Sequence, residues 1–347
     1  MIIRESTESP TISVVIPLYN KRFFVSSCLE SIGEQTFKDF EIIVVDDGST
    51  DGSAEVAQVY LRCKDRLIRQ RNAGVSAARN KGIAESRGKY VTFLDADDKW
   101  EPGYLEAVVD LADRYPEAGI LATGYRMQFP KGRAVEVTIS EVNHHQTHLV
   151  FDYFRRSIGW AFIWTGCITI PRKVLTMMEG FPANVPGIQS EDLDLWSRIA
   201  LRYPIAYDTR ILAVYNLGIP GQYASRLHDF SRNPIGCLPY IRFLHSVVAE
   251  SWVAASLRND ILAYIKNQLI ECAYYILRTA NRSAFMYWLR DTLSTFPCPW
   301  WVKLLRLPTM WALLQLWAML RRLLSSRFLL SLMGGERVSH GVIRRLR

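Results

Sequence analysis

Short apolar runs alternate with amphipathic stretches along roughly the first hundred residues of the chain. The runs are rich in Val, Ile, Leu and Phe and end at polar or glycine-containing turns, a pattern that predicts buried strands over residues 12–18, 41–45, 66–69 and 90–94. The intervening stretches have helical spacing and predict helices over residues 21–33, 51–63 and 76–86. Strands that alternate with helices are typical of an α/β fold with a mostly parallel sheet.

The alternation becomes less regular beyond residue 100. We expect helices over 101–115, 172–179 and 191–201, strands over 119–127, 164–171 and 211–217, and a polar loop over 133–148. From about residue 233 helical patterns dominate and strand patterns are missing. The sequence therefore predicts an α/β domain over residues 1–232 and a helical C-terminal region over residues 233–347.

Three carboxylates crowd the end of the predicted strand over residues 90–94, at Asp95, Asp97 and Asp98. Ligands of open α/β sheets bind at the carboxyl ends of the strands. Acids this close repel one another unless a cation lies among them, and Mg²⁺ or Mn²⁺ often joins one or two carboxylates to substrate phosphates. The pattern favours a phosphorylated substrate held through a metal. The alternative is an acidic turn that solvates the end of a strand.

Other polar side chains follow the neighbouring strands. Tyr19 comes just after the first strand and offers a flat face for stacking. Asp46 and Asp47 end the second strand, where a carboxylate can accept hydrogen bonds from a base N–H or from ribose hydroxyls. Arg79 lies near the start of the third helix, where backbone amides and a guanidinium favour phosphate. We therefore expect a nucleotide at this edge of the sheet.

Composition narrows the class of protein. Of the 347 residues 49% are apolar, so the chain can bury a sizeable core. The six cysteines include no C-x-x-C pair, which argues against a zinc site or a disulfide framework and favours a reducing compartment. Residues 1–10 lack the apolar segment of a signal peptide, so we expect a cytoplasmic protein.

The net charge of +8 is concentrated at the C-terminal end of the chain. Over residues 299–347 nine lysines and arginines are opposed only by Glu336, and nine minus one accounts for the whole excess. Trp and Leu lie between these arginines on a predicted amphipathic helix over residues 310–333. Such a helix suits an anionic membrane surface.

The longest uncharged stretch of this tail, residues 307–320, has 14 residues, fewer than the roughly 20 that a membrane-spanning helix needs. We therefore expect residues 299–347 to lie on a membrane surface without crossing it. The alternative is a helical subdomain that packs against the rest of the chain or against a second copy. Nucleic acid fits this tail poorly because aromatic and leucine residues dominate between the arginines.

Five blocks of sequence stand in order along the chain. They are Ser13-Val-Val-Ile-Pro-Leu-Tyr-Asn20, Asp46-Asp-Gly-Ser-Thr-Asp51, Asn72-Ala-Gly-Val-Ser-Ala-Ala-Arg-Asn-Lys-Gly82, Phe93-Leu-Asp-Ala-Asp-Asp98 and Glu191-Asp-Leu-Asp-Leu-Trp-Ser-Arg198. Over about residues 10–230 the chain resembles glycosyltransferase family 2, whose members have the GT-A fold. Any single block is weak evidence, whereas five blocks in this order argue against a different kind of α/β domain.

The resemblance implies an inverting transfer of a sugar from a nucleoside diphosphate sugar, usually a UDP sugar, to a hydroxyl acceptor. Pro17 and Tyr19 are then expected to line the nucleoside pocket, and Asp47 to accept a hydrogen bond from the base. It also implies that Arg79 lies near the nucleotide and that Asp95 holds the ribose.

The metal of this family, Mg²⁺ or Mn²⁺, is expected at the D-x-D acids. Asp97 or Asp98 is the expected ligand, directly or through water, and the spacing of the two acids does not decide between them.

The resemblance also implies that Asp192 is the general base. An acceptor hydroxyl must lose a proton as it attacks the anomeric carbon, so a base is needed on the side of the sugar away from the metal. The adjacent Glu191 is expected to orient the start of the helix or the donor sugar. The alternative for both acids is simple stabilisation of a helix N-terminus, where negative charge is favourable.

One departure from the family pattern concerns the segment Tyr215 to Arg226, where members often carry a His and this chain carries none. Gln222, Ser225 or Arg226 is available to meet the diphosphate instead. The departure leaves open a second reading, a weak or inactive nucleotide-sugar-binding partner subunit. For an active enzyme we expect a saccharide or lipid-linked acceptor, a place in surface polysaccharide or glycolipid synthesis, and a peripheral position on the cytoplasmic face of the membrane.

Overall fold

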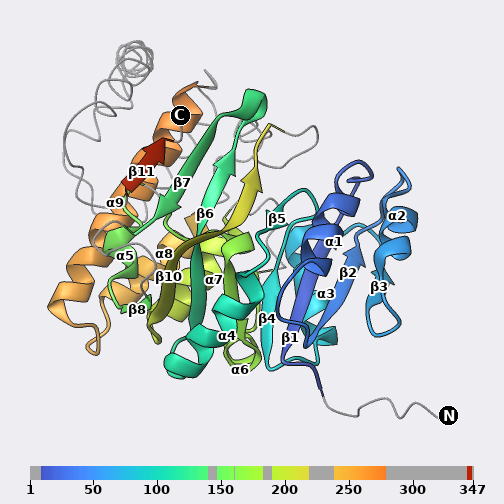
Figure 1. Cartoon of the computed structure of the whole chain (residues 1–347). Coiled ribbons are helices and arrows are strands. Elements are labelled where there is room, and N and C mark those ends of the chain that lie inside the picture. Colours follow the sequence, from blue (N-terminus) through green and yellow to red (C-terminus); the bar gives the residue numbers. More distant parts are fainter. Residues whose placement is uncertain are drawn as a thin grey trace.

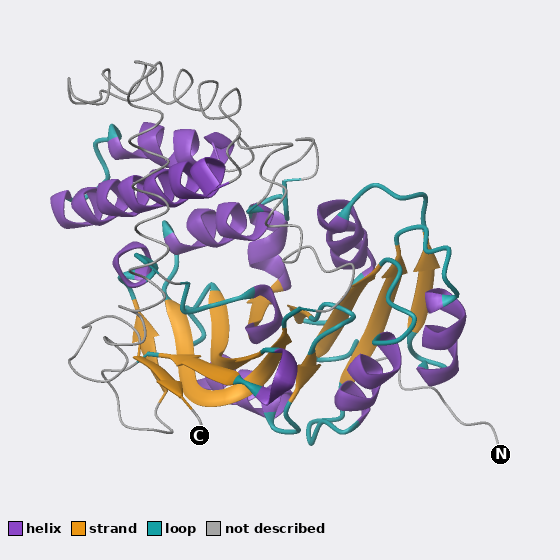
Figure 2. Cartoon of the chain, turned by 90° about the horizontal axis from the view of Figure 1, so that it is seen from above, coloured by secondary structure: helices purple, strands orange, loops and turns teal. Residues whose placement is uncertain are grey.

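The structure is a computed structural model that describes residues 9–139, 147–159, 161–182, 190–218, 238–278 and 342–345. These residues form an eleven-stranded sheet with helices on both of its faces (Figures 1 and 2). The α/β class predicted from the sequence is confirmed.

One end of the sheet consists of parallel strands. They are β1 (Ile12–Leu18), β2 (Phe40–Asp46), β3 (Arg66–Arg69) and β4 (Tyr90–Phe93), in the order β3-β2-β1-β4. Every residue of β2 and β4 is buried, as expected for apolar strands covered on both faces. The register pairs Leu18 with Asp46 and Val15 with Phe93. The residues that follow β1, β2 and β4 therefore meet at one edge.

The other end of the sheet is mixed. Its strands are β5 (Lys99–Trp100), β6 (Ile120–Gln128), β7 (Ala134–Thr138), β8 (Thr147–Val150), β9 (Ile168–Pro171), β10 (Ile205–Asn216) and β11 (Val342–Arg345). The antiparallel β9 joins β4 to β6, and β10 runs parallel to β6. β10 is antiparallel to β5 and β8, so its carboxyl end lies beside the turn that follows β4.

The helices and helical turns are α1 (Val25–Gly33), α2 (Ser53–Tyr60), α3 (Val75–Glu85), α4 (Tyr104–Arg114), η1 (Pro130–Gly132), α5 (Tyr153–Arg156), η2 (Thr165–Cys167), α6 (Arg172–Met177), α7 (Glu191–Ala200), α8 (Leu238–Val248) and α9 (Ala255–Arg278). Helix α3 packs against β1 and β2, whereas α4 packs against β6 and β10. α1 begins four residues later than the predicted Lys21, because Lys21 to Phe24 form a turn whose carbonyl at Lys21 accepts from Phe24 and Val25.

Several expectations for the chain beyond residue 98 are wrong. The predicted loop over 133–148 contains β7 and the start of β8, because Val135 and Val137 alternate inward while polar neighbours face outward. The predicted strand over 164–171 begins instead with the η2 turn. The last strand begins at Ile205 and not at 211; a register shift after Asp208 interrupts its apolar pattern. β5 was not predicted, and β11 lies in the region expected to be helical.

The helices that open the C-terminal region pack against the α/β part. α8 and α9 contact each other, α9 contacts α5, and α8 contacts α7. Tyr264 of α9 is fully buried, with its ring 5.6 Å from that of Phe154 and 6.2 Å from that of Tyr153. The predicted boundary near residue 232 and the predicted amphipathic helix over 310–333 lie outside the described residues. None of the described helices combines the length and the apolar character that crossing a bilayer requires.

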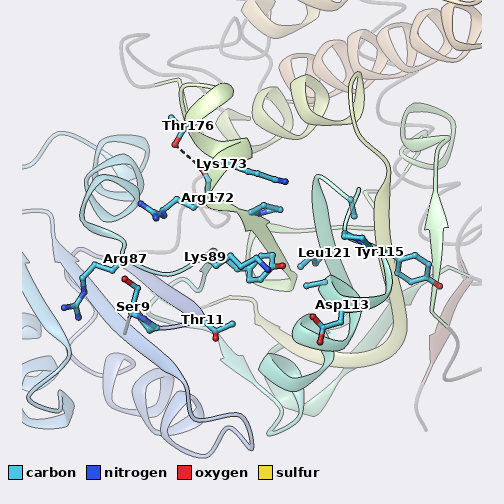
Figure 3. A pocket seen from close by; sticks show the side chains of 16 residues that line it. Ser9, Thr11, Arg87, Lys89, Asp113, Tyr115, Leu121, Arg172, Lys173 and Thr176 are labelled. Atoms are coloured by element: carbon cyan, nitrogen blue, oxygen red, sulfur yellow. Dashed lines mark hydrogen bonds between the residues drawn. The ribbon is translucent and has the colours of Figure 1, made fainter. Parts of the chain in front are cut away.

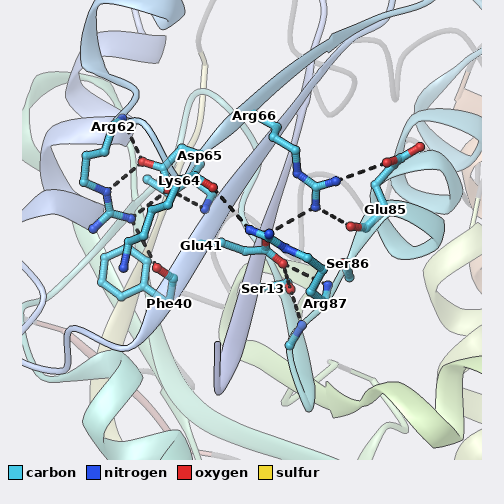
Figure 4. A network of polar contacts seen from close by, with 12 residues as sticks. Ser13, Phe40, Glu41, Arg62, Lys64, Asp65, Arg66, Glu85, Ser86 and Arg87 are labelled. Atoms are coloured by element: carbon cyan, nitrogen blue, oxygen red, sulfur yellow. Dashed lines mark hydrogen bonds and ion pairs between the residues drawn. The ribbon is translucent and has the colours of Figure 1, made fainter. Parts of the chain in front are cut away.

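A buried carboxylate ties the amino ends of the parallel strands together (Figure 4). Glu41 of β2 is fully buried and accepts from the Ser13 hydroxyl of β1 at 2.7 Å and from the Arg87 backbone N–H at 2.8 Å. Burial raises the pKa of Glu41, but the hydrogen bonds from Ser13 and Arg87 outweigh burial and lower it overall. The Ser13 hydroxyl accepts in turn from the Gly88 N–H at 2.9 Å. This network fixes β1, β2 and the start of β4 at the edge away from the acids.

Close contact between α3 and β1 depends on a glycine. A Cβ atom added to Gly82 would lie 2.2 Å from Cγ1 of Val15, far inside van der Waals contact. Gly33 at the end of α1 has no atom within 4 Å of the same position.

We therefore predict that Gly82→Ala destabilises the fold by about 1–3 kcal/mol, the usual cost of overpacking a core. Gly33→Ala should change stability by about 0.5 kcal/mol or less, or increase it, because it only restricts the unfolded chain. Urea unfolding of both variants measures the difference. Equal stability of the two variants would contradict close packing of α3 on β1.

Candidate active site

The D-x-D acids lie in a tight turn directly after β4. The Asp98 N–H donates to the Asp95 carbonyl at 2.9 Å, which closes the turn. Asn216, the last residue of β10, donates its backbone N–H to Oδ1 of Asp98 and its side-chain amide to the Asp97 carbonyl, both at 2.8 Å. The ends of β4 and β10 are thus joined through the acids themselves.

The three acids occupy different electrostatic environments. Asp97 is 8% exposed and Asp98 is 1% exposed. Burial raises the pKa of Asp97, Asp95 raises it further, and Lys21 lowers it through an ion pair of 2.6 Å between Nζ and Oδ2. Burial and the two neighbouring acids raise the pKa of Asp98 well above its usual value, although the hydrogen bond from the Asn216 N–H lowers this pKa. The cluster therefore favours additional positive charge.

These acids fit a divalent cation that takes only part of its ligands from the protein. Oδ2 of Asp98 is buried and has no hydrogen-bond partner, so one carboxylate oxygen is left uncompensated. Within the described ranges, no three acids, histidines or cysteines converge as a complete ligand set. Mg²⁺ is commonly bound by one or two carboxylates together with substrate phosphates. The donor set here suits that mode of binding.

Arg79 of α3 connects the acids after β4 to the start of α7. Its Nη2 donates to Oδ1 of Asp95 and its Nη1 to Oε1 of Glu191, each at 2.9 Å. The guanidinium is 4% exposed and lies 5.3 Å from the ring centre of Phe181. The family resemblance places Arg79 near the nucleotide; the geometry adds that both of its terminal nitrogens already donate to carboxylates. Arg79 is therefore a bridge between two acidic groups.

Asp192 lies in the first turn of α7, beside this bridge. Burial raises its pKa to about 6, Glu191 contributes to the rise, and Arg79 opposes it. One of its oxygens accepts from the Leu193 N–H at 2.8 Å. A carboxylate with a pKa near 6 is deprotonated at neutral pH and is a stronger base than an ordinary aspartate. This is the protonation behaviour that a general base requires.

The residues expected around the nucleoside lie at the same edge of the sheet. They differ in exposure and in the hydrogen bonds that they already make. Pro17 is partly buried within β1, and Tyr19 is 44% exposed just beyond it. Asp47 is buried and accepts from the Gln70 side chain at 2.8 Å and from the Ala73 and Gly74 N–H groups at 2.9 Å. Asp47 therefore shapes the loop that leads into α3, whereas Tyr19 presents an open ring.

An aromatic pair lies close to both groups of acids. The rings of Trp164 and Tyr215 are stacked at 4.6 Å with an angle of 25°. Burial raises the pKa of the Tyr215 hydroxyl, and so do the charges of Asp98 and, more weakly, Asp192. Trp196 of α7 is fully buried and packs against Phe181.

Lys21 and Asn216 are the contacts of the acids that the sequence did not identify. Each is a polar residue at or just beyond the carboxyl end of a strand, β1 and β10 respectively, and that position is the signal by which they could have been found. The alternatives to the missing His, Gln222, Ser225 and Arg226, lie outside the described residues.

A cavity of about 750 Å³ lies at the opposite edge of the sheet (Figure 3). It is bordered by Thr11 and Tyr90 at the amino ends of β1 and β4 and by Pro171 at the end of the antiparallel β9. The acids lie at the carboxyl ends of the same strands, so this cavity is separate from the candidate active site.

Solved structures with the same architecture are glycosyltransferases of the GT-A fold. S. aureus TarS 1–349 in complex with UDP-GlcNAc has a TM-score of 0.64 and 18% identity, covering 83% of this chain and 82% of that one. The mannosyltransferase PcManGT from Pyrobaculum calidifontis, in complex with GDP-Man and Mn²⁺, has a TM-score of 0.55 and 18% identity, covering 91% and 88%. These likenesses define the class of fold.

Sequence comparison defines the family. Residues 13–175 match the model of "Glycosyl transferase family 2". The chain is 33% identical over 161 residues to "Putative glycosyltransferase EpsH" of Bacillus subtilis (strain 168), covering 44% of this chain and 46% of that protein. It is 29% identical over 214 residues to "Putative teichuronic acid biosynthesis glycosyltransferase TuaG" of the same strain, covering 60% and 79%. The matched part thus spans about half of EpsH. Residues 13–175 therefore belong to glycosyltransferase family 2.

Removal of the Arg79 charge should lower the stability of the protein. Arg79→Met should destabilise the protein by about 3 kcal/mol at pH 7, because the carboxylates of Asp95 and Glu191 lose their shared partner. Lys81→Met, on the same helix, removes only an exposed pair with Glu85 and should change stability little. Urea unfolding at pH 7 measures both variants; equal stability of Arg79→Met and Lys81→Met would contradict the bridge.

Proposed function

We propose that this protein is an inverting glycosyltransferase that transfers a sugar from a nucleoside diphosphate sugar, with UDP as the nucleotide, to a hydroxyl acceptor. One observation carries the proposal. Arg79 bridges Asp95, one of the acids after β4, to Glu191, whose neighbour Asp192 lies in the first turn of α7 with a raised pKa. Displacement at an anomeric carbon needs such an arrangement, with charge stabilisation at the leaving group and a base at the attacking hydroxyl.

The nucleoside half of the donor is assigned to the edge beyond β1 and β2. The exposed ring of Tyr19 is available to stack on the base, with Pro17 beside it. Asp47 offers carboxylate oxygens to a base N–H, and Asp95 offers its remaining oxygen to the ribose. UDP as the nucleotide is supported by the TarS complex with UDP-GlcNAc.

Asp97 and Asp98 are the proposed ligands of Mg²⁺ or Mn²⁺, supported by the uncompensated Oδ2 of Asp98 and by the Mn²⁺ in PcManGT. When bound, the cation neutralises charge on the departing diphosphate. Asp98 is kept in place by Asn216, and Asp97 by Lys21, so the protein holds the two acids ready for the donor.

Asp192 is the proposed general base. It takes the proton from the acceptor hydroxyl while the oxygen attacks the sugar from the face away from the diphosphate, which inverts the anomeric configuration. Glu191 positions the first turn of α7 through its contact with Arg79. The stacked rings of Trp164 and Tyr215 form an aromatic surface suited to a sugar ring.

The acceptor is proposed to be a saccharide or a lipid-linked saccharide in surface polysaccharide synthesis. The name of TuaG, which refers to teichuronic acid biosynthesis, supports a polysaccharide product. The basic, Trp- and Leu-rich residues 299–347 support binding to the cytoplasmic surface of a membrane, where a lipid-linked acceptor would lie.

Donor binding tests the proposal directly. A thermal-shift experiment with UDP-GlcNAc, UDP-glucose, GDP-mannose and UDP, with and without Mn²⁺, should raise Tm most for a UDP compound with Mn²⁺, by mass action. A chain that shows no shift with any nucleotide, with or without Mn²⁺, would refute the donor site.

Asp192→Asn should lower the turnover number by about 10²–10⁴-fold while leaving UDP binding intact, because a carboxamide cannot accept the proton. Asp194→Asn is the matched control on the same helix, since Asp194 pairs with Arg198. It should retain most activity. Release of UDP with acceptor present is the assay; unchanged turnover in Asp192→Asn would remove Asp192 as the base. Binding without turnover in the unmodified protein would favour an inactive partner subunit.

Turnover at saturating donor should fall as the pH decreases through about 6, the pKa to which burial and Glu191 raise Asp192. The sign follows because a base acts only when deprotonated, so activity is present above this pKa and decreases about tenfold per pH unit below it. A pH–rate profile measures the midpoint. An acid limb near pH 4, the ordinary range of an aspartate, would contradict the assignment.

A further inference from the structure

The contact between Lys21 and Asp97 joins two residues 76 positions apart in the chain. Nζ of Lys21 lies 2.6 Å from Oδ2 of Asp97, and the two side chains are only 13% and 7% exposed. Long lysine side chains on surfaces usually keep their charged ends in water. This ammonium is instead held inside the site, on the carboxylate assigned to the metal.

The backbone holds Lys21 in this position. Asn20, just before it, has a left-handed φ of 51°, and its side-chain oxygen accepts from the Thr50 N–H at 2.9 Å. The Lys21 N–H donates to the Ser53 hydroxyl at 2.7 Å. The turn between β1 and α1 is therefore fixed to the start of α2, and the lysine side chain reaches back to the acids.

Charge balance explains why the contact forms. Asp95, Asp97 and Asp98 lie within one turn, and Arg79 pairs with Asp95. The other two acids are buried, both have a raised pKa, and Lys21 lowers that pKa for each. Lys21 thus supplies the positive charge that this part of the site needs while no other cation is bound.

We infer that Lys21 is the resident counter-ion of Asp97 and competes with the divalent cation for that carboxylate. The inference rests on the proposed function, which assigns Asp97 to the metal. An ammonium at 2.6 Å and a dication cannot share Oδ2 without strong repulsion, so occupation by one displaces the other. The displaced ammonium, on a flexible four-carbon stem, is then free to pair with the diphosphate of the donor. The metal therefore binds weakly alone and more tightly with the nucleotide.

Titration with Mn²⁺, followed by electron paramagnetic resonance of the free ion, tests this without an activity assay. Lys21→Met keeps the length of the side chain and removes its charge. Without nucleotide, this variant should bind Mn²⁺ about tenfold more tightly than wild type, the factor that corresponds to about 1.4 kcal/mol. Addition of UDP should increase Mn²⁺ affinity more in wild type than in Lys21→Met, because only wild type has an ammonium to transfer.

Lys99→Met is the matched control. Lys99 is exposed, lies two positions beyond Asp97 in the chain, and has no ion pair within the ranges that the structure describes. Its removal takes the same charge from the neighbourhood without touching Asp97, and Mn²⁺ affinity should change by about twofold or less. An equal gain in Mn²⁺ affinity in Lys99→Met would mean that the effect is one of long-range charge, and would overturn the inference. Unchanged Mn²⁺ affinity in Lys21→Met would also overturn it, as would the absence of Mn²⁺ binding by both wild type and Lys21→Met.

Wild-type protein provides a second readout that does not depend on the folding of a variant. Reductive methylation followed by mass spectrometry should modify Lys21 more when saturating Mn²⁺ is present, with Lys99 unaffected. No increase at Lys21 would contradict displacement.

If UDP-GlcNAc raises Tm while Mn²⁺ binds wild type and Lys21→Met equally, the inference fails and the donor site stands. If Lys21→Met binds Mn²⁺ more tightly but no nucleotide raises Tm, the donor proposal fails instead.

Discussion

A buried guanidinium held between two carboxylates is the interaction on which the candidate active site depends. Arg79 joins Asp95, at the end of a strand, to Glu191, at the start of a helix, and Arg79 and Glu191 are 112 positions apart in the chain. Buried carboxylates cost several kcal/mol unless they are paired and hydrogen-bonded. Without this cation, the acids of β4 and α7 would repel each other. With it, the acids after β4 and those of α7 can be held in one site while Asp192 keeps a pKa near 6.

The parallel strands place the groups held by this interaction at one edge of the sheet. Because β1, β2 and β4 share one register, polar residues that follow each strand gather at a single edge. Glu41 and Ser13 fix the opposite ends of these strands, whereas Lys21, Arg79 and Asn216 contact the acids at the edge that follows β4. Structural and chemical roles are thus divided between the two ends of the strands.

Local pattern was enough to predict the first half of the fold and the acidic residues. β1, β2 and β4 are continuous apolar runs, and the D-x-D acids follow the last of them directly. β7 was missed because only Val135 and Val137 carry its inward face, and the first part of β10 was missed because a register shift after Asp208 breaks its pattern. The partners of the acids could not be read from local sequence, since Lys21 and Arg79 reach residues 76 and 112 positions away. Such contacts exist only once the sheet has brought distant segments together.

The stereochemistry of the reaction tests the central claim most directly, because it depends on Asp192 and the D-x-D acids standing on opposite sides of the sugar. UDP-GlcNAc carries its sugar in the α configuration, and slow hydrolysis with water as acceptor avoids the need to know the natural acceptor. Proton NMR, recorded before the released sugar equilibrates, identifies the first anomer formed. The account predicts the β anomer. Release of the α anomer would mean that the two groups of acids do not act from opposite faces, and would contradict it.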